Sequence, residues 1–510
     1  MAKTPSNKLF HLVKSLSGSE KRYFKLFVSA KENGNNKYDQ LFDAIDTQAE
    51  FNDDALRLTI YGDEPIETRK FSELKAYLYD LILKSLQSYD EKSSVDYKLK
   101  NMLLGVRTLF KRSHFDDCKD ILKKAKKLAL TYEDFNSLIE ILDWEKKIAH
   151  TQTDISFLDK ELDRIAIEER KYLQQLINIS NYKNTFFKIL VSLRKDVSRS
   201  ERQNKALQDL ISDPLFGNEE QAGSYKSKIL LYRSTSLYHF SRSDFNTFHI
   251  DCAKLVQLME SNEKMLKEDV SEYISVLNNY IISCGVLNKF EEINTALDKL
   301  KNITPITLDD AAKIHRQYYL NKLKLCITSG QFEEGLAEMK NHLKEIEKFD
   351  QNQFLKNNFY FYYFNIHFGN EDFDGALAWI NKWLMLPDSS DMNDLQGLAR
   401  ILNLIVNYEI GNTILLESLL RSTHRYLKNE NQLSALEKRI IDFIKQMNNP
   451  LTKKEKKEAF SGLREDYKKI STDQHIGVLE NFDFDAWFAS KINNRKFAEE
   501  VKLKFNKSNS

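Results

Sequence analysis

Apolar residues recur along much of the chain at intervals of three and four positions, the spacing that places them on one face of a helix. A clear series is Phe332, Leu336, Met339, Leu343 and Ile346. The chain has only 15 Gly and 6 Pro in 510 residues, roughly two to four times fewer than average usage would give. Few positions therefore demand a turn, and we expect an all-α fold of long helices.

An aromatic residue followed by an acidic residue recurs along the chain, at Phe115, Phe290, Phe332 and Phe373. Other positions complete a series of phase residues spaced by 41 to 45 residues: Phe115, Phe157, Glu201, Phe245, Phe290, Phe332, Phe373 and Ile414. A period of this length indicates stacked supersecondary units. We therefore predict about eight antiparallel helix pairs, each with its second helix beginning at a phase residue.

The residues in front of the phase residues support this interpretation. Ser243-Asp244 and Gly330-Gln331 are turn-forming pairs that end one helix, and the acids that follow the aromatic residue meet the positive end of the next helix dipole. A first helix is expected from Leu308 to Thr328, where Thr307 and Asp310 have the spacing of a capping interaction.

The segments Gly330–Met339 and Asn370–Trp379 resemble the second helix of the tetratricopeptide repeat, which opens with a turn, an aromatic residue, acids and a small residue. The resemblance covers about residues 96–430, although these units exceed the 34 residues of that family by 7 to 11. It implies a right-handed superhelical solenoid with a concave groove. The whole chain also resembles uncharacterised bacterial helical-repeat proteins, which implies no activity.

The two ends lack the repeated motif, so we predict three regions: an N-terminal helical domain in residues 1–95, helical repeats in 96–445 and a C-terminal helical cap in 446–510. A solenoid needs an atypical end element to cover its last apolar face. The aromatic residues Phe482, Phe484, Trp487 and Phe488 supply apolar surface for that purpose.

Charge and cysteine content limit the possible partners and the compartment. The chain has 76 Lys and Arg against 75 Asp and Glu, so its overall charge gives no argument for nucleic acid. Four cysteines without a CxxC pair suit buried, reduced thiols. No signal peptide is apparent, and no apolar stretch approaches the ~18 residues of a membrane span. We expect a cytoplasmic protein without a membrane span.

No familiar catalytic, phosphate-binding or metal-binding motif is present, and we expect a chain that is not an enzyme and needs no cofactor or metal. One recurring position could suggest a metal site, because it is occupied by His or Cys in four units. His239, Cys284, Cys326 and His367 each precede a phase residue by six positions. Neighbouring helix axes lie ~8 to 10 Å apart, whereas zinc holds its ligands at ~2.0 to 2.3 Å. We therefore interpret this register as helix packing.

The tetratricopeptide resemblance implies which side chains line the groove: Arg233, Asn278, Lys324, Asn358, Phe361 and Asn365. Asn and Arg suit a peptide backbone or a carboxylate, and Phe361 suits an apolar anchor. Ordinary packing of the aromatic run Phe359–Phe364 is the competing interpretation. The leading hypothesis is a non-catalytic scaffold that binds a protein or peptide.

The alternative is a nucleic-acid-binding regulator. The first 31 residues carry seven Lys or Arg and one acid, Glu20, and two short helices around Ser17-Gly-Ser19 would allow a helix-turn-helix. A second basic run, Lys123, Lys124, Lys126 and Lys127, is interpreted as a solvated helix face.

Overall fold

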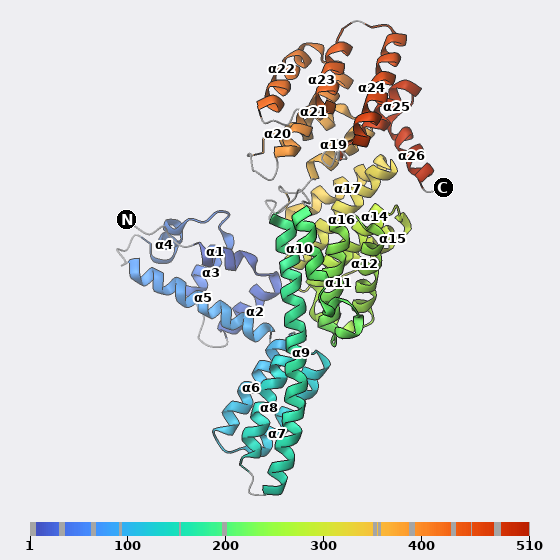
Figure 1. The fold of residues 1–510 in the computed structure, drawn as a ribbon. Coiled ribbons are helices and arrows are strands. Elements are labelled where there is room, and N and C mark those ends of the chain that lie inside the picture. Colours follow the sequence, from blue (N-terminus) through green and yellow to red (C-terminus); the bar gives the residue numbers. More distant parts are fainter. Residues whose placement is uncertain are drawn as a thin grey trace. The chain divides into compact units, whose positions relative to one another are not determined.

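The computed structural model describes residues 7–29, 36–62, 68–90, 94–151, 155–195, 201–349, 354, 359–386, 393–429, 435–449, 451–473 and 481–508. Within these ranges every regular element is a helix and none is a strand (Figure 1). Consecutive helices pack against one another through most of the chain. The all-α prediction is confirmed. None of the described helices is both long and apolar enough to span a membrane.

The chain divides into two compact units. Unit 1 comprises Met1–Leu287 with Ile303–Ala311, and unit 2 comprises Asn288–Asn302 with Ala312–Ser510. This division falls inside the predicted repeat region, so the boundaries at residues 95 and 445 stay a prediction.

Unit 1 begins with five helices that share a core of their own. Apolar residues at helical spacing, such as Leu78 and Ile82, point into this core together with Val13 and Leu41. The five helices are α1 (Lys8–Ser15), α2 (Gly18–Ser29), α3 (Lys37–Thr47), α4 (Asp53–Tyr61) and α5 (Thr68–Asp90).

The rest of unit 1 continues as a chain of neighbouring helices, with α9 packing against both α8 and α11. These helices are α6 (Val95–Phe110), α7 (Phe115–Thr131), α8 (Phe135–Ala149), α9 (Ile155–Lys195), α10 (Glu201–Ile211), α11 (Tyr225–Ser241), α12 (Phe245–Glu260), α13 (Glu263–Glu268) and α14 (Val270–Val286). Two short 3₁₀ turns, Pro214–Phe216 and Glu219–Gln221, connect α10 to α11.

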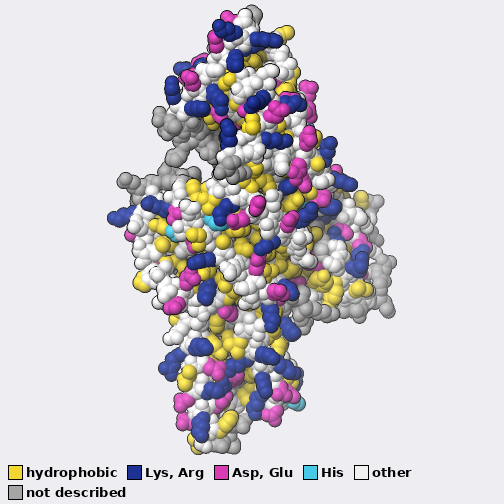
Figure 2. All heavy atoms as spheres, turned by 90° about the vertical axis from the view of Figure 1, so that its right-hand side faces the viewer, with side chains coloured by type: hydrophobic (Ala, Val, Ile, Leu, Met, Phe, Trp, Pro, Cys, Tyr) yellow, Lys and Arg dark blue, Asp and Glu magenta, His cyan; other side chains and the backbone are white. Residues whose placement is uncertain are grey.

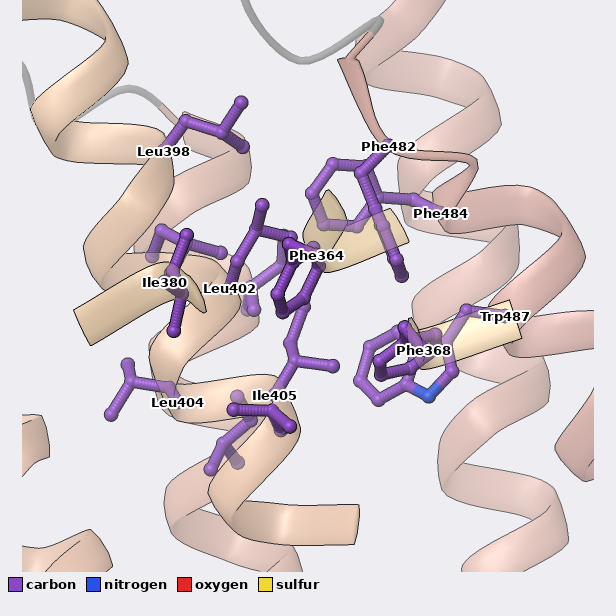
Figure 3. Packing of buried hydrophobic residues seen from close by; sticks show 14 of the residues in the cluster. Phe364, Phe368, Ile380, Leu398, Leu402, Leu404, Ile405, Phe482, Phe484 and Trp487 are labelled. Atoms are coloured by element: carbon purple, nitrogen blue, oxygen red, sulfur yellow. The ribbon is translucent and has the colours of Figure 1, made fainter. Parts of the chain in front are cut away.

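Unit 2 contains one large core formed mainly by α19 to α26. Its helices are α15 (Phe290–Lys301), most of α16 (Leu308–Ser329), α17 (Phe332–Glu345), α19 (Phe359–Gly369), α20 (Phe373–Leu384), α21 (Asn393–Ile410), α22 (Thr413–Asn429), α23 (Ala435–Met447), α24 (Lys453–Asp473), α25 (Phe484–Asn493) and α26 (Phe497–Ser508). Leu402 and Ile405 of α21 are fully buried in this core (Figure 3).

Most predicted phase residues begin a helix. Phe115, Phe245, Phe290, Phe332 and Phe373 are each the first residue of their helix. Two positions earlier the chain adopts a left-handed conformation, with φ between 58° and 72° at these five turns. The next amide typically donates to a carbonyl five residues back, as Asp244 N does to His239 O at 3.0 Å. This is the Schellman ending of one helix, and it places the start of the next.

The series is interrupted between Phe115 and Phe245, although the phase residue Glu201 is the first residue of α10. Phe157 is the third residue of α9, a single helix of 41 residues, and does not open the second helix of a pair. A helix start that the period does not predict occurs at Phe135, where Asp134 caps α8. The evenly spaced series of eight helix pairs therefore does not describe this part of the chain.

The C-terminal helices do more than cover the end of the stack. Phe497 of α26 packs against Phe332 and Phe368, and Phe505 packs against Phe290 at 4.4 Å between ring centroids. The segment that follows α24 therefore returns along the turns of earlier helices in unit 2.

Candidate functional site

The recurring His and Cys register has an explanation in the helix turns. The carbonyls of His239, Cys326 and His367 accept the amide that closes the turn before the next helix, at 2.9 to 3.0 Å. The imidazole of His367 also contacts Asp372 at 2.7 Å, and Asp372 caps the start of α20. These residues thus share a structural position in separate turns, which accounts for their common spacing.

The cysteines are buried, as expected. All four are free thiols in the interior. Burial raises the pKa of Cys252 and of Cys326 to about 12, so these thiols stay protonated at neutral pH and are poor nucleophiles.

The six predicted groove residues are in different environments. Arg233 on α11 is half-buried, pairs with Glu272 at 2.8 Å and lies 4.3 Å from the Phe186 ring. Asn278 on α14 is half-buried and Lys324 on α16 is exposed. Asn358 lies outside the described residues.

The remaining two, Phe361 and Asn365 on α19, are buried. The Phe361 ring lies 4.6 Å from that of Trp383. The Asn365 amide donates to Phe361 O at 2.7 Å and to Asn481 O at 3.1 Å.

The segment after Asn481 packs against the same helix. Phe482 contacts Phe364 and Phe368 of α19, and Phe484 and Trp487 join the same core (Figure 3). While this segment is in place, neither Phe361 nor Asn365 is open to a partner. Phe361 is thus packed as in the competing interpretation of the aromatic run.

Two lysines of the basic N-terminal region form ion pairs within their own domain. Lys21 pairs with Asp46 at 2.6 Å and Lys25 pairs with Asp43 at 2.7 Å, while Lys14 donates to the Asp46 carbonyl. On the face of the molecule in Figure 2, cationic and anionic side chains are interspersed. The ion pairs of Lys21 and Lys25 do not favour the nucleic-acid alternative, which requires a concentrated positive surface.

Within unit 1, α7, α8 and α9 enclose a hollow of about 580 Å³, here called the α7–α9 hollow. Its floor is apolar and consists of Leu122, Ile148 and Ala149, all buried. Leu130 and Phe157 complete its apolar lining and are about half exposed. The volume is in the range of sites that hold small molecules or side chains of a partner.

Charged residues also line the hollow, with cations in excess. Five cations and two carboxylates contribute: Lys119, Lys123, Lys126, Lys127, Arg164, Glu145 and Glu161. Lys123 and Lys127 are exposed, and no ion pair is recorded for either within the described part of the chain. The hollow therefore combines an apolar floor with cations that are available to a ligand.

The inner charges of the hollow form a preorganised network. Arg164 of α9 contacts Glu161 at 2.6 Å and Glu145 of α8 at 2.8 Å, and Lys126 of α7 contacts Glu145 at 3.0 Å. The hydrogen bond to Glu161 raises the pKa of Arg164, and the same bond lowers the pKa of Glu161. Both groups stay charged at neutral pH, and the network links the three helices that form the hollow.

The sequence contains only part of this site. The lysine run of α7 and Phe157 can be seen in the sequence. Taken alone, however, the lysines are interpreted as a solvated helix face and Phe157 as the start of a second helix. Lys123 and Lys127 become part of a candidate binding site only because α8 and α9 place apolar side chains beside them.

Comparisons of the chain with protein-family models, with curated proteins and with solved structures gave no significant match. The resemblance to the tetratricopeptide repeat therefore rests on segments of this chain alone, Gly330–Met339 and Asn370–Trp379.

Proposed function

We propose that this chain is a non-catalytic binding protein whose α7–α9 hollow receives a segment of a partner protein that combines apolar and acidic side chains. The observation that carries the proposal is the hollow itself, with Leu122 and Ile148 at its floor and the exposed Lys123 and Lys127 among its lining residues. An apolar side chain of the partner would occupy the floor, and neighbouring carboxylates would meet the lysines.

Two physical effects support binding at this place. Apolar surface that leaves water contributes about 25 cal/mol per Å², and the floor already has its shape because the Arg164 network joins α7, α8 and α9. A preformed site loses less conformational freedom on binding than a flexible one. The lysines would act mainly on orientation and on the rate of association.

We further propose that the helix pairs whose second helices begin at Phe245, Phe290, Phe332 and Phe373 belong to a right-handed solenoid of the tetratricopeptide kind. In that arrangement Arg233, Asn278 and Lys324 are the remaining candidates for a second contact with the partner. The α7–α9 hollow is preferred as the primary site, because Phe361 and Asn365 of the predicted groove are buried.

The test is direct binding of fluorescent peptides about ten residues long that alternate Phe or Leu with Glu, measured by anisotropy. The double variant Lys123→Glu/Lys127→Glu should weaken binding by at least about tenfold, or about 1.4 kcal/mol. Binding of the unaltered chain should also weaken with added salt, because exposed charges are screened.

A matched control is the double variant Lys111→Glu/Lys124→Glu, which makes the same charge change at two exposed lysines outside the hollow. It should bind as the unaltered chain does. Equal loss in both double variants would indicate a nonspecific charge effect and refute the site, as would no peptide binding at all. Salt-sensitive binding of duplex DNA that persists in both variants would favour the nucleic-acid alternative.

A further inference from the structure

Helix α9 has one face that packs inside the protein and an opposite face that does not. Ile165, Tyr172, Tyr182, Phe186 and Ile189 are buried on the inner face. At 100° per residue these positions fall within about 60° of one direction. The inner face accounts for the packing of α9 against α8 and α11.

The outer face of α9 carries an apolar stripe. Its large side chains are between 40% and 81% exposed, and in helical projection they fall within about 40° of one line, which lies about 140° around the helix from the centre of the buried face: Ile155, Leu162, Leu173, Ile177, Phe187 and Val191. Ala166 and Asn184 lie on the same line. Asp159, Glu169 and Ser180 also fall within this span, so the apolar stripe is interrupted by polar positions. Exposed apolar side chains gathered on one helix face mark an interaction site.

We propose that a second copy of this chain packs along this stripe, with the two α9 helices antiparallel and related by a two-fold axis near residue 175. This proposal goes beyond the binding function of the α7–α9 hollow. The residues that α9 contributes to the hollow, Phe157, Glu161 and Arg164, are on the other side of the helix in the same projection.

The charges beside the stripe favour this occupant and this orientation. Asp159 and Asp163 lie on one flank near the start of α9, and Lys188 lies on the same flank near its end. All three are exposed. In antiparallel helices the same flanks of the two copies meet, so an axis near residue 175 places Asp163 opposite Lys188 of the second copy. Both symmetry-related ends gain this pair, whereas a parallel arrangement leaves the acids and the lysines at opposite ends.

The length of the stripe is sufficient for a stable dimer. The 41 residues of α9 span about 60 Å at 1.5 Å per residue. A contact strip about 10 Å wide, the diameter of a helix, would cover on the order of 600 Å² on each copy. The total of about 1,200 Å² reaches the range of specific protein interfaces.

Sedimentation equilibrium of the full chain tests the proposal. The unaltered protein, with a chain mass of 59.8 kDa, should reach twice that mass at tens of micromolar. Ile177→Glu should weaken the dimer by at least about tenfold, because near the axis it brings two carboxylates together on apolar surface. Ile167→Glu is the matched control, since Ile167 is 66% exposed and Ile177 is 60% exposed on the same helix, but Ile167 lies off the stripe. The control should dimerise normally.

A cross-linking experiment tests the orientation. Ala166 and Asn184 are placed symmetrically about residue 175, and the four native cysteines are buried. A mixture of the Ala166→Cys and Asn184→Cys variants should form a disulfide-linked pair on mild oxidation, and neither variant alone should do so. A monomeric protein, equal weakening by both glutamate variants, or cross-linking of either cysteine variant to itself would overturn the proposal. Peptide binding in the α7–α9 hollow is measured independently and does not depend on these outcomes.

Discussion

Two histidines in unit 2 form a buried pair that should make this unit sensitive to mild acid. His315 Nε2 and His342 Nδ1 lie 2.8 Å apart, and the pair is surrounded by aromatic rings, with Phe359 stacked on His342 at 4.4 Å. His315 Nδ1 lies 3.4 Å from Glu345, whereas His342 Nε2 is buried without a hydrogen-bond partner among the described residues. Among the residues that the structure describes, no neighbour of His342 favours its protonation.

Burial, together with the neighbouring His315, lowers the pKa of His342 to about 3. Burial also lowers the pKa of His315. Because the folded pKa lies below the ordinary value of 6.5, the unfolded chain binds protons more readily than the folded one. The contribution to stability is complete above pH 6.5 and is lost as the pH falls. At pH 5, His342 alone should cost about 2 kcal/mol.

Hydrogen exchange of the amides in α17 and α19, corrected for intrinsic rates, measures the free energy of opening this part of the molecule. Between about pH 7.5 and pH 5 the protection should fall by roughly thirtyfold. His342→Leu should remove most of this dependence. His424→Leu, at an exposed histidine of α22, should leave it unchanged. A parallel loss of protection in the unaltered chain and in His342→Leu would refute the assignment.

Three further substitutions test the packing and the helix ends. Gly369→Ala should destabilise unit 2 by about 2 kcal/mol, because an added Cβ would overlap the Phe332 ring; normal thermal unfolding would contradict this. Glu409→Ala should cost about 2 kcal/mol in denaturant, since the buried carboxylate accepts from Trp487 at 2.6 Å and is paired with a lysine; a neutral effect would contradict it. Asp134→Ala should lose about 1 kcal/mol and speed hydrogen exchange in the first turn of α8, whose cap it forms; unchanged exchange would count against the cap.

The sequence determined the features that depend on neighbouring residues. The starts of helices at Phe245, Phe332 and Phe373 were predictable, because the turn before each one is built from residues within about six positions and leaves a recognisable motif. The burial of the cysteines was equally predictable from the sequence. A period in the sequence did not reveal that α9 continues for 41 residues, since continuation of a helix needs only the absence of a stop.

Tertiary structure decided which of these surfaces remain open. Phe361 and Asn365 were chosen from a helix register, but their burial depends on Trp383 and on Asn481, the second of these more than a hundred positions away. Likewise Leu122 and Ile148 lie on separate helices, and only the packing of α7, α8 and α9 leaves a hollow beside them. Whether a side chain is exposed depends on which other parts of the chain cover it. Local sequence patterns therefore determined the helices of this protein, whereas long-range packing determined its surface.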